Sequence, residues 1–537
     1  MTVRHAPAPA TDGDLSQAAW EGKSRRIYSE VKRRPEKRFL CTLFPKITFF
    51  FDGTGNNAYQ ELEKPISEQA LSNVAKLFRV AVNDPSGQGA TPIYIPGVGT
   101  PFRIPRRADG YTDLLRDDNG GPRGLGLGAG GDMRIEYAIS EFCRILEQDW
   151  SEGALNHMPY INLAVFGFSR GATEARAFVR RLIEKKCQRT DEGLCWIAAM
   201  SFKRVPLRIT FMGLFDTVAS VGGPSLHLDW ASELAIPPEV ERCVHYVAAH
   251  EVRQAFPLDS VRVARSYPEN CEEVVYPGVH SDVGGGYALE QQGRSNLLSR
   301  IPLRHMYAEA LRAEVPLWEP EKVQEDIRQD YALPDDDPVS SLYQSYMAAL
   351  PALGDDVESL IQTHRRLQFQ WRGALHRNGE DERVLGMLYG NVGMSACREA
   401  PVATELDHPP CAPTEWTYAV PANPEKQALQ LLGEQRRLAV RVAFLRNPVE
   451  GLRRNHDWPS SQPRKRTPYE DLILSAWDNH AVIPLPVDTF LAEYVHDSVA
   501  HFSSWPCALY DTRGVYCDRA KYYAQYRTRG NESPAAA

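Results

Sequence analysis

The sequence predicts an α/β fold, a mostly parallel sheet flanked by helices, followed by a mainly helical C-terminal region. Three observations support this prediction. Apolar runs of strand length alternate with stretches of helical periodicity between residues 45 and 310. These runs, such as residues 47–51 and 161–168, are continuously apolar, which is typical of strands buried on both faces. Beyond residue 310 the patterns become mainly helical, for example over residues 342–375 and 425–445.

Length and composition indicate a globular chain that buries a large core. None of the 537 residues lies in an apolar stretch of the roughly 18 to 20 residues that a membrane span requires, and the N-terminus has no apolar signal core. We therefore expect a soluble protein that is made in the cytoplasm without a signal peptide. A net charge of −8 on so long a chain gives no overall attraction to nucleic acid. The ten cysteines form no C-x-x-C pair and no cysteine–histidine ladder, so we expect no metal site.

Composition divides the chain into three segments. Residues 1–44 are polar and then basic, with the positive charges concentrated over residues 23–38, and we expect a solvated extension there. Residues 45–310 hold the alternating strand and helix patterns and form the predicted α/β domain. Residues 311–537 are predicted to form a helical region whose frequent aromatic residues pack a core. The alternative is that this region serves as a lid over the active site or as a membrane-contacting module.

The strongest local signal is a strand, a sharp turn and a helix over residues 161–183. The turn reads Gly-Phe-Ser-Arg-Gly at residues 167–171. Its two glycines keep side chains away, so that the hydroxyl of Ser169 stands clear of the backbone at the end of the sheet. This pattern predicts a nucleophile elbow with Ser169 as the nucleophile. The alternative is an ordinary β-to-α turn in which the serine caps the helix.

A second glycine-rich turn follows the strand predicted over residues 47–51 and reads Asp-Gly-Thr-Gly-Asn-Asn. In a serine hydrolase, such a loop supplies one backbone N–H group of the oxyanion hole, and the residue after the nucleophile supplies the other. Gly53, Thr54 and Arg170 are therefore the predicted donors. Two alternatives stay open. Either the loop cradles phosphate in a magnesium-dependent phosphatase or phosphotransferase that uses Asp52, or it is a tight turn without chemistry.

Two further strand ends carry the residue types that a serine nucleophile needs. The strand predicted over residues 207–215 ends at Asp216, and a short strand over residues 273–278 leads to His280. The order serine, acid, histidine along the chain is that of α/β-hydrolases. We therefore predict a triad of Ser169, Asp216 and His280. The alternatives are a turn-forming aspartate and a histidine that only braces its loop.

Other acids and histidines receive lesser roles in this prediction. Asp282 is the rival acid, but it follows His280 too closely to orient its ring. His496 lies in a predicted helix and is the second choice for the base, or a residue that supports the site from behind. A further helix is predicted over residues 240–254, with its histidines in the core or on the surface. Asp52, Asp282 and His496 are thus the candidate supporting residues.

Five blocks of sequence resemble one family closely. Over about residues 40–310 the chain resembles the bacterial type VI secretion lipase effectors of the first class, a branch of the α/β-hydrolases. Five blocks in the right order are far more specific than the elbow alone. They lie at residues 50–57, 96–100, 167–172, 214–218 and 277–287.

The resemblance implies an antibacterial phospholipase A that hydrolyses carboxylic ester bonds of membrane phospholipids without a metal or organic cofactor. By motif match, the family's serine, aspartate and histidine fall on Ser169, Asp216 and His280. The resemblance also implies secretion by the type VI system and action at the periplasm or membrane of a target cell. It implies two protein partners, a secretion spike protein and a cognate immunity protein. A non-catalytic cargo or adaptor on a hydrolase fold is the remaining alternative.

Overall fold

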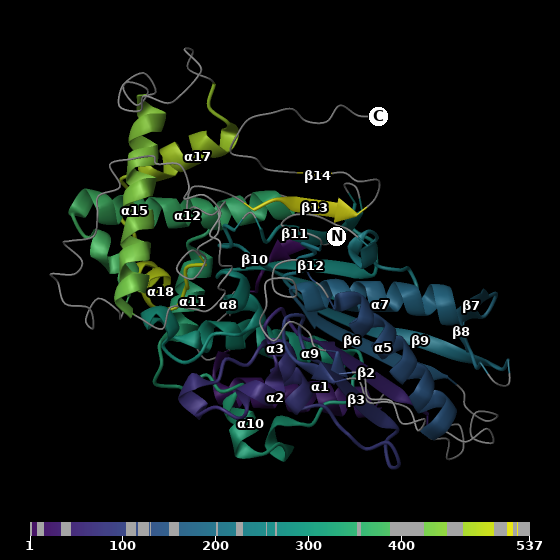
Figure 1. Ribbon diagram of the computed structural model, residues 1–537. Helices are drawn as coiled ribbons and strands as arrows, with labels where there is room; N and C mark the ends of the chain where they lie inside the picture. Colours follow the sequence, from purple (N-terminus) through teal and green to yellow (C-terminus); the bar gives the residue numbers. More distant parts are fainter. Residues whose placement is uncertain are drawn as a thin grey trace.

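A nine-stranded sheet lies at the centre of the structure, which is a computed structural model (Figure 1). Its main path runs in the order β1-β12-β10-β9-β6-β2-β3, and every neighbouring pair on this path is parallel. β8 extends the sheet by antiparallel pairing with β9, and β7 pairs with β8. The structure describes residues 3–7, 15–33, 44–103, 114–115, 128, 130–149, 160–199, 202–221, 229–253, 255–263, 266–351, 356–386, 424–447, 465–498, 513–518 and 523–524.

The central strands β2, β6 and β10 are buried along most of their length, whereas the edge strands β1 and β7 are partly exposed. The apolar sequence of the central strands is the one expected of parallel strands that are covered on both faces. The bounds of the strands of this sheet are β1 (Val3–His5), β2 (Lys46–Phe51), β3 (Ala90–Ile95), β6 (Ile161–Phe168), β7 (Cys187–Thr190), β8 (Gly193–Ile197), β9 (Arg204–Phe215), β10 (Cys243–Ala248) and β12 (Cys271–Tyr276).

Side chains of β2 alternate between the two faces of the sheet. Phe50 stacks on Phe166 of β6 with ring centroids 5.0 Å apart. Phe49 and Phe51 point to the opposite face, where both rings contact Phe178 at centroid distances of 4.7 and 5.5 Å. All of these rings are fully buried. Each face of the sheet therefore needs its own layer of apolar cover.

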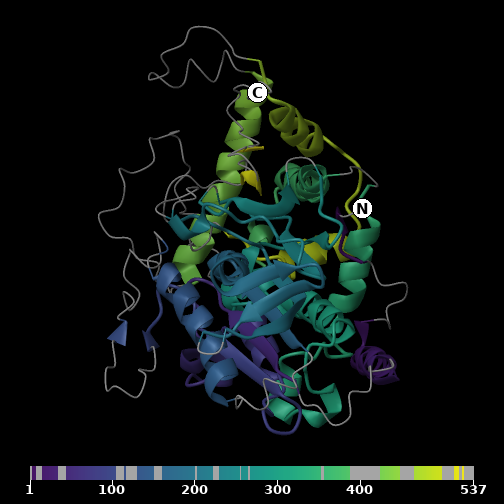
Figure 2. The same cartoon turned by 90° about the vertical axis from the view of Figure 1, so that its right-hand side faces the viewer.

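Helices supply this cover on both faces (Figure 2). Two helices belong to the apolar cluster of Phe49 and Phe51, and three others from the N-terminal and α/β parts of the chain belong to the cluster of Phe50. This arrangement confirms the predicted α/β fold. The first two helices are α5 (Gly131–Arg144), which continues as a π-helical turn over Ile145–Asp149, and α7 (Arg170–Lys186); the other three are α1 (Gln17–Arg33), α3 (Asn73–Arg79) and α9 (Arg300–Arg312).

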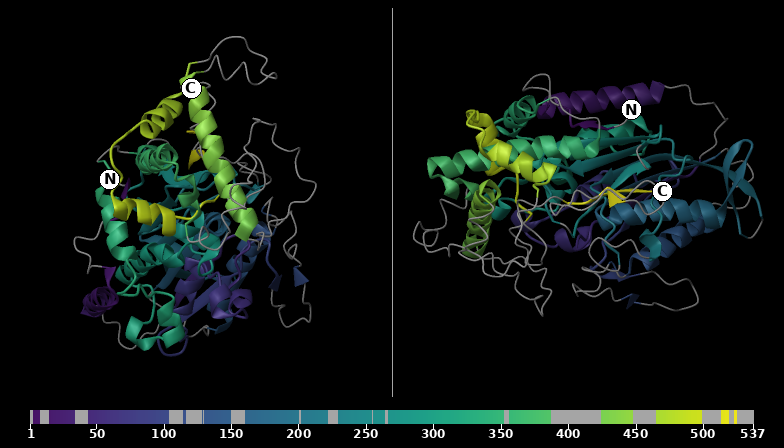
Figure 3. Two further views of the ribbon diagram at one scale, coloured as in Figure 1. Left: turned by 90° about the vertical axis from the view of Figure 1, so that its left-hand side faces the viewer. Right: turned by 90° about the horizontal axis from the view of Figure 1, so that it is seen from above.

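The described part of the region after residue 310 is mainly helical, as predicted (Figure 3). α15 confirms the helix predicted over residues 425–445, whereas the stretch over residues 342–375 forms two helices, α11 and α12. Tyr343 of α11 and Phe490 of α18 join the same apolar cluster as Phe50. The helices are α10 (Glu325–Gln329), α11 (Val339–Ala348), α12 (Val357–Asn378), α15 (Pro424–Arg446), α17 (Pro468–Trp477) and α18 (Leu485–Glu493); α2 (Ala58–Glu61) and α8 (His280–Gly284) lie earlier in the chain.

One C-terminal element returns to the α/β part of the molecule. β13 (Val515–Asp518) pairs in parallel with β11 (Leu258–Val263), and β14 (Tyr523–Ala524) pairs with β13. Figure 1 shows this second sheet beside β10 and β12. A further two-stranded sheet joins β4 (Phe102–Arg103) and β5 (Leu114–Leu115). A role of residues 311–537 as a lid or membrane-contacting module stays a prediction, as do the boundaries at residues 44 and 310.

The solvated extension predicted for residues 1–44 is wrong for the described part of that segment. β1 adds an edge strand to the sheet, with Val3 opposite Glu273 of β12. α1 packs on α9 and buries Trp20, whose ring stacks on Tyr331 at 5.4 Å. Lys23, Arg25, Arg26 and Lys32 lie on the exposed side of the helix. The positive charge therefore marks the outer face of an amphipathic helix.

Two predicted helices are also wrong. Residues 240–254 contain strand β10, which is buried along its whole length. A segment buried on all sides shows no amphipathic period, so its sequence does not separate a strand from a helix. The helix predicted around His496 ends at Glu493, and His496 lies in the turn after α18. Within the described residues, no helix combines the length and the apolar character that crossing a bilayer requires.

Candidate active site

Ser169 occupies the strained turn that the sequence predicted between strand β6 and helix α7. Its φ of 57° and ψ of −126° are unusual for a residue with a side chain. A Cβ atom added to Gly171 would lie 2.2 Å from the carbonyl oxygen of Asp52, and one added to Gly167 would lie 2.5 Å from Ala172 Cα. Only glycine fits at both positions. The close packing of this turn explains the Gly-x-Ser-x-Gly pattern.

The turn is tied to the neighbouring end of strand β9. The Ser169 N–H group donates to the carbonyl oxygen of Phe215 at 3.0 Å, and the Val218 N–H group donates to the carbonyl oxygen of Ser169 at 3.3 Å. Asp216, with a φ of 40°, lies between these two contacts. Ser169 and Asp216 therefore follow adjacent parallel strands at the same edge of the sheet.

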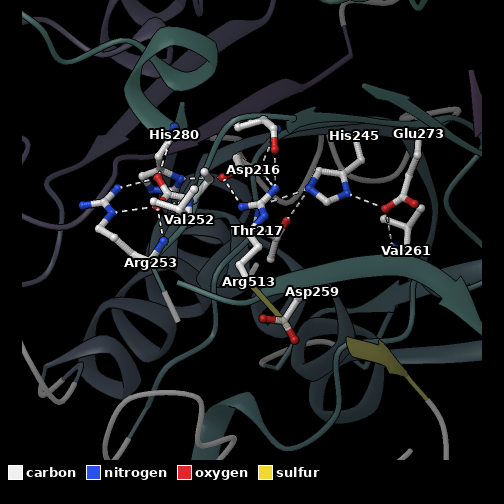
Figure 4. Close-up of polar contacts among 12 residues, drawn as sticks. Asp216, Thr217, His245, Val252, Arg253, Asp259, Val261, Glu273, His280 and Arg513 are labelled. Atoms are coloured by element: carbon white, nitrogen blue, oxygen red, sulfur yellow. Dashed lines mark hydrogen bonds and ion pairs between the residues drawn. The ribbon is translucent and has the colours of Figure 1, made fainter. Parts of the chain in front are cut away.

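Asp216 and His280 form a buried pair at this edge (Figure 4). His280 Nδ1 donates to Asp216 Oδ2 at 2.6 Å. The N–H group of Ala248 donates to the other carboxylate oxygen at 2.8 Å. An imidazole whose Nδ1 carries the proton presents Nε2 as a hydrogen-bond acceptor. The structure thus brings together the acid and the histidine that the sequence predicted.

Arg513, which the sequence analysis did not single out, is a third member of this cluster. Its Nη1 and Nη2 atoms donate to Asp216 Oδ2 and Oδ1, each at 2.7 Å, and Nη2 also donates to the carbonyl oxygen of Ala248 at 2.9 Å. Asp216 and Arg513 are 0% and 1% exposed. No local motif surrounds Arg513, and its partner lies several hundred residues earlier, so the sequence carried no signal for this contact.

Burial and charge act in opposite directions on the two titratable groups of the pair. Burial alone would raise the pKa of Asp216, but the charge of Arg513 and the hydrogen bonds from His280 and Arg513 hold this pKa well below its usual range. Burial lowers the pKa of His280, and the hydrogen bond to Asp216 opposes that effect. The pair is therefore an ionised carboxylate and a neutral imidazole at neutral pH.

His280 Nε2 is buried and has no hydrogen-bond partner among the described residues. The ring lies against Phe168, the residue before the serine, with centroids 4.6 Å apart, and against Phe256 at 5.3 Å. The backbone N–H group of His280 donates to Glu251 at 3.4 Å, and Glu251 is paired with Arg253. Aromatic walls and an unoccupied Nε2 atom suit a general base that acts on a neighbouring group.

The loop after β2 lies beside the elbow and is tightly packed. The Gly53 N–H group donates to its neighbour Asp52 Oδ1 at 2.7 Å. Tyr94 also donates to the Asp52 carboxylate, and burial raises the pKa of Asp52 to about 6. Of the predicted oxyanion donors, Gly53 thus has its N–H group engaged within the loop. The N–H groups of Thr54 and of Arg170, the first residue of α7, stay the predicted donors.

Asp282 and His496 form a second buried pair that holds the His280 loop. His496 Nδ1 donates to Asp282 Oδ1 at 2.6 Å, and the N–H groups of His496 and Val279 both donate to Asp282 Oδ2 at 3.0 Å. The His496 ring stacks on Tyr287 at 3.9 Å. Asp282 therefore links the turn after α18 to the residue that precedes His280, as expected of a supporting residue.

A third pair of this kind lies within the sheet and was also not predicted. His245 of β10 and Glu273 of β12 are directly opposite in the strand register, and His245 Nδ1 donates to Glu273 Oε1 at 2.8 Å (Figure 4). The Thr217 N–H group donates to His245 Nε2 at 3.0 Å. A histidine and a glutamate inside otherwise apolar strands were the signal available in the sequence. Among the described residues, no group of three or more His, Cys, Asp or Glu side chains could hold a metal ion.

A parallel sheet between helical layers, with a serine on the strained turn from a central strand to its helix, is the architecture of an α/β-hydrolase. Residues 46–187 and 184–309 match the family model described as "T6SS, Phospholipase effector Tle1-like, catalytic domain". The chain therefore carries a catalytic domain of the Tle1-like phospholipase effectors of the type VI secretion system. Ser169, Asp216 and His280 lie inside the matched residues, whereas His496 and Arg513 lie outside them.

Two solved structures are similar to the chain. A crystal structure described as an uncharacterized protein from Pseudomonas aeruginosa is 24% identical, with a TM-score of 0.64 over 98% of this chain and 86% of that one. A structure of the Tle1 effector bound to the VgrG spike from the type 6 secretion system is 18% identical, with a TM-score of 0.37 over 60% of this chain and 84% of that one. None of the curated proteins matches. The first of these structures supports the fold.

Proposed function

We propose that the chain hydrolyses the carboxylic ester bonds of membrane phospholipids by a Ser-His-Asp mechanism. The observation that carries the proposal is the Asp216–His280 pair, whose Nε2 atom is buried without a partner beside the strained turn of Ser169. The substrate class rests on the description of the matching family. The chemistry rests on the residues themselves.

The proposed reaction begins when His280 Nε2 removes the proton from the Ser169 hydroxyl as its oxygen attacks the ester carbonyl. Asp216 keeps the imidazole in the required tautomer and stabilises the imidazolium that forms. The N–H groups of Thr54 and Arg170 bind the oxyanion. His280 then gives its proton to the departing alcohol, and the bond between the acyl carbon and that oxygen breaks. Water, activated by the same histidine, releases the fatty acid and restores Ser169.

The setting proposed for this activity is antibacterial. We propose delivery by a type VI secretion apparatus, action at the periplasm or membrane of a target cell, and a spike protein and an immunity protein as partners. Delivery by this apparatus rests on the family description, and the target cell and the two partners are what the sequence resemblance implies. The phosphotransferase alternative is less well supported, because the Asp52 carboxylate is fully buried and receives donors from Gly53 and Tyr94.

The test compares the parent chain with Ser169→Ala on phospholipid vesicles in the presence of EDTA, with released fatty acid as the readout. We expect release by the parent and a loss of several orders of magnitude in the variant. Ser281→Ala, which removes a hydroxyl next to His280, is the matched control and should keep the parent's rate. A fluorophosphonate probe should label the parent and the control but not Ser169→Ala.

Three outcomes would contradict the proposal. Equal release by Ser169→Ala would remove the serine from the mechanism. Activity that depends on magnesium would favour the phosphotransferase alternative. A parent chain that neither releases fatty acid nor reacts with the probe would favour the cargo or adaptor alternative.

A further inference from the structure

The acid of the proposed triad receives two of its hydrogen bonds from a segment that lies outside the residues matched by the family model. Arg513 approaches Asp216 with both terminal nitrogens of its guanidinium, one on each carboxylate oxygen. This fork is the strongest geometry available to a neighbouring cation, because two parallel charge-assisted bonds fix both the position and the plane of the carboxylate. With this plane fixed, Oδ2 is held 2.6 Å from His280 Nδ1.

A shared strand pairing fixes Arg513 and the Asp216 loop relative to each other. β13 begins two residues after Arg513, and the Leu258 N–H group of β11 donates to the carbonyl oxygen of the intervening Gly514 at 2.8 Å. The next residue of β11, Asp259, donates its own N–H group to the carbonyl oxygen of Thr217 at 2.9 Å, and its Oδ2 accepts from Ala219 N–H at 2.7 Å. β11 therefore contacts the residues that follow Asp216 on one side and the residues that follow Arg513 on the other.

The positive charge of Arg513 also offsets the unfavourable free energy of burying the Asp216 carboxylate. Asp216 is fully buried, and a buried carboxylate whose charge has no counterion is strongly disfavoured. The neighbouring imidazole is neutral before the reaction, so it supplies a hydrogen bond but no charge. Arg513 is the cation in direct contact with the carboxylate.

We propose that Arg513 is a positioning residue for hydrolysis, and that residues 513–516 complete the active site by holding Asp216 ionised and aimed at His280. The inference rests on the function proposed above. Arg513 contacts the acid and not the substrate, so it acts through Asp216 and His280.

Because Arg513 is charged, its removal should change the pH dependence of kcat. The charged groups around His280 are Asp216 at the end of β9, Glu251 and Arg253 after β10, and Arg513 behind Asp216. A positive charge near an imidazole disfavours its protonated form. Removal of Arg513 should therefore let His280 take up a proton at higher pH, because Ala248 N–H and His280 still hydrogen-bond the Asp216 carboxylate.

The experiment measures kcat and KM for phospholipid vesicles between pH 4 and 9 for the parent, Arg513→Met and Arg513→Lys. Arg262→Met is the matched control, since Arg262 of β11 is also buried and forms an ion pair with Glu358, which is not part of the proposed triad. Thermal unfolding of each protein is recorded in parallel.

We expect Arg513→Met to lower kcat about 100-fold, with KM within about threefold of the parent, because the acid is no longer held in position. The acid limb of its profile should move to higher pH by about one unit. Arg513→Lys keeps the charge but loses the fork, so kcat should fall about tenfold with the limb unmoved. Arg262→Met should change the unfolding temperature but should not shift the acid limb of the pH profile.

Two results would overturn the inference while leaving the proposed function intact. One is an active parent and an Arg513→Met variant with the same kcat and the same acid limb. The other is a loss in Arg513→Met that Arg262→Met reproduces, which would assign Arg513 to stability alone. If Arg513→Met does not fold, an Arg513→Lys variant with the same kcat as the parent would also overturn the inference. An inactive parent contradicts the proposed function instead.

Discussion

His280 and His245 are two buried histidines with nearly the same first contact and different second contacts. Each directs Nδ1 at a buried carboxylate, Asp216 at 2.6 Å and Glu273 at 2.8 Å. His245 Nε2 accepts a hydrogen bond from Thr217 N–H, whereas His280 Nε2 has no partner among the described residues. The distance between a histidine and a carboxylate thus does not identify a general base. What separates His280 from His245 is the unoccupied Nε2 atom beside the turn of Ser169.

The carboxylates of the two pairs also differ in the groups that donate hydrogen bonds to them. Besides His245, Glu273 accepts hydrogen bonds from Ser260 Oγ, Val261 N–H and Tyr267 Oη at 2.7 to 2.9 Å. Its charge is thus spread over neutral donors that join β12 to β11. Asp216 is instead held by the Arg513 cation. One pair connects strands, and the other presents a reactive nitrogen at the edge of the sheet.

The largest difference should appear when each histidine is replaced by asparagine. His280→Asn should lower kcat at least about 10⁴-fold with little change in unfolding temperature, because it removes the base and leaves the strands paired. His245→Asn should keep kcat per folded molecule within about tenfold and destabilise the fold, because it breaks a buried network. Vesicle hydrolysis and thermal unfolding measure both effects. An equal loss of kcat in the two variants, with both folded, would break the comparison.

An intermediate effect on kcat is expected when the Asp282–His496 pair is broken. The Nε2 atom of His496 is also buried without a partner among the described residues. His496→Asn should lower the free energy of unfolding by about 2 kcal/mol and kcat by about tenfold, because Asp282 positions the residue before His280. The control is His376→Asn, since His376 pairs with Asp381 at 2.9 Å on the surface and should change stability by less than about 0.5 kcal/mol.

Denaturant titration and vesicle hydrolysis would measure the His496 variant. A loss of kcat in His496→Asn as large as that in His280→Asn would mean that His496 is the base. That result would contradict the role of general base proposed for His280.

The smallest effect on turnover should come from Glu273→Gln, which keeps the shape of the side chain and removes its charge. Although burial alone would raise the pKa of Glu273, the hydrogen bonds from His245, Val261 N–H and Tyr267 lower it from 4.5 to about 2. Its ionised form therefore stabilises the fold above pH 4.5, and this stabilisation is lost as the pH falls from 4.5 towards 2. At pH 7 the variant should be less stable by about 3 kcal/mol, with kcat within about threefold of the parent.

Denaturant titrations between pH 3 and 7 measure this difference in stability. The gap between the parent and Glu273→Gln should narrow as the pH falls below 4.5. A gap that stays constant over that range would mean that the Glu273 charge contributes nothing to stability.

The parts of the site that could be predicted from sequence are those encoded by a few neighbouring residues. The elbow around Ser169 needs glycines at fixed spacing, so its strand, turn and helix were visible. Asp216 and His280 follow apolar strands directly, and the order along the chain linked them to Ser169. The fold of residues 45–310 was predictable for the same reason, because buried parallel strands and amphipathic helices each leave a local pattern.

The features that were missed depend on pairing between distant segments. β1 is only three residues long and is a strand because β12 lies beside it. Arg513 meets Asp216 because β13 pairs with β11, and nothing near residue 513 indicates that pairing. β10 was predicted as a helix because a segment buried on every side lacks the amphipathic period that separates the two structures.

The contact between Asp216 and Arg513 also sets when the site can be complete during biosynthesis. The ribosome adds Arg513 several hundred residues after Ser169, and at about 5 to 20 residues per second this delay lasts tens of seconds. From residue 280 onward, which is most of that interval, the nascent chain already contains the serine, the aspartate and the histidine. The fork on the aspartate forms only after its arginine has left the exit tunnel, so the site is completed only once residue 513 has emerged from the ribosome.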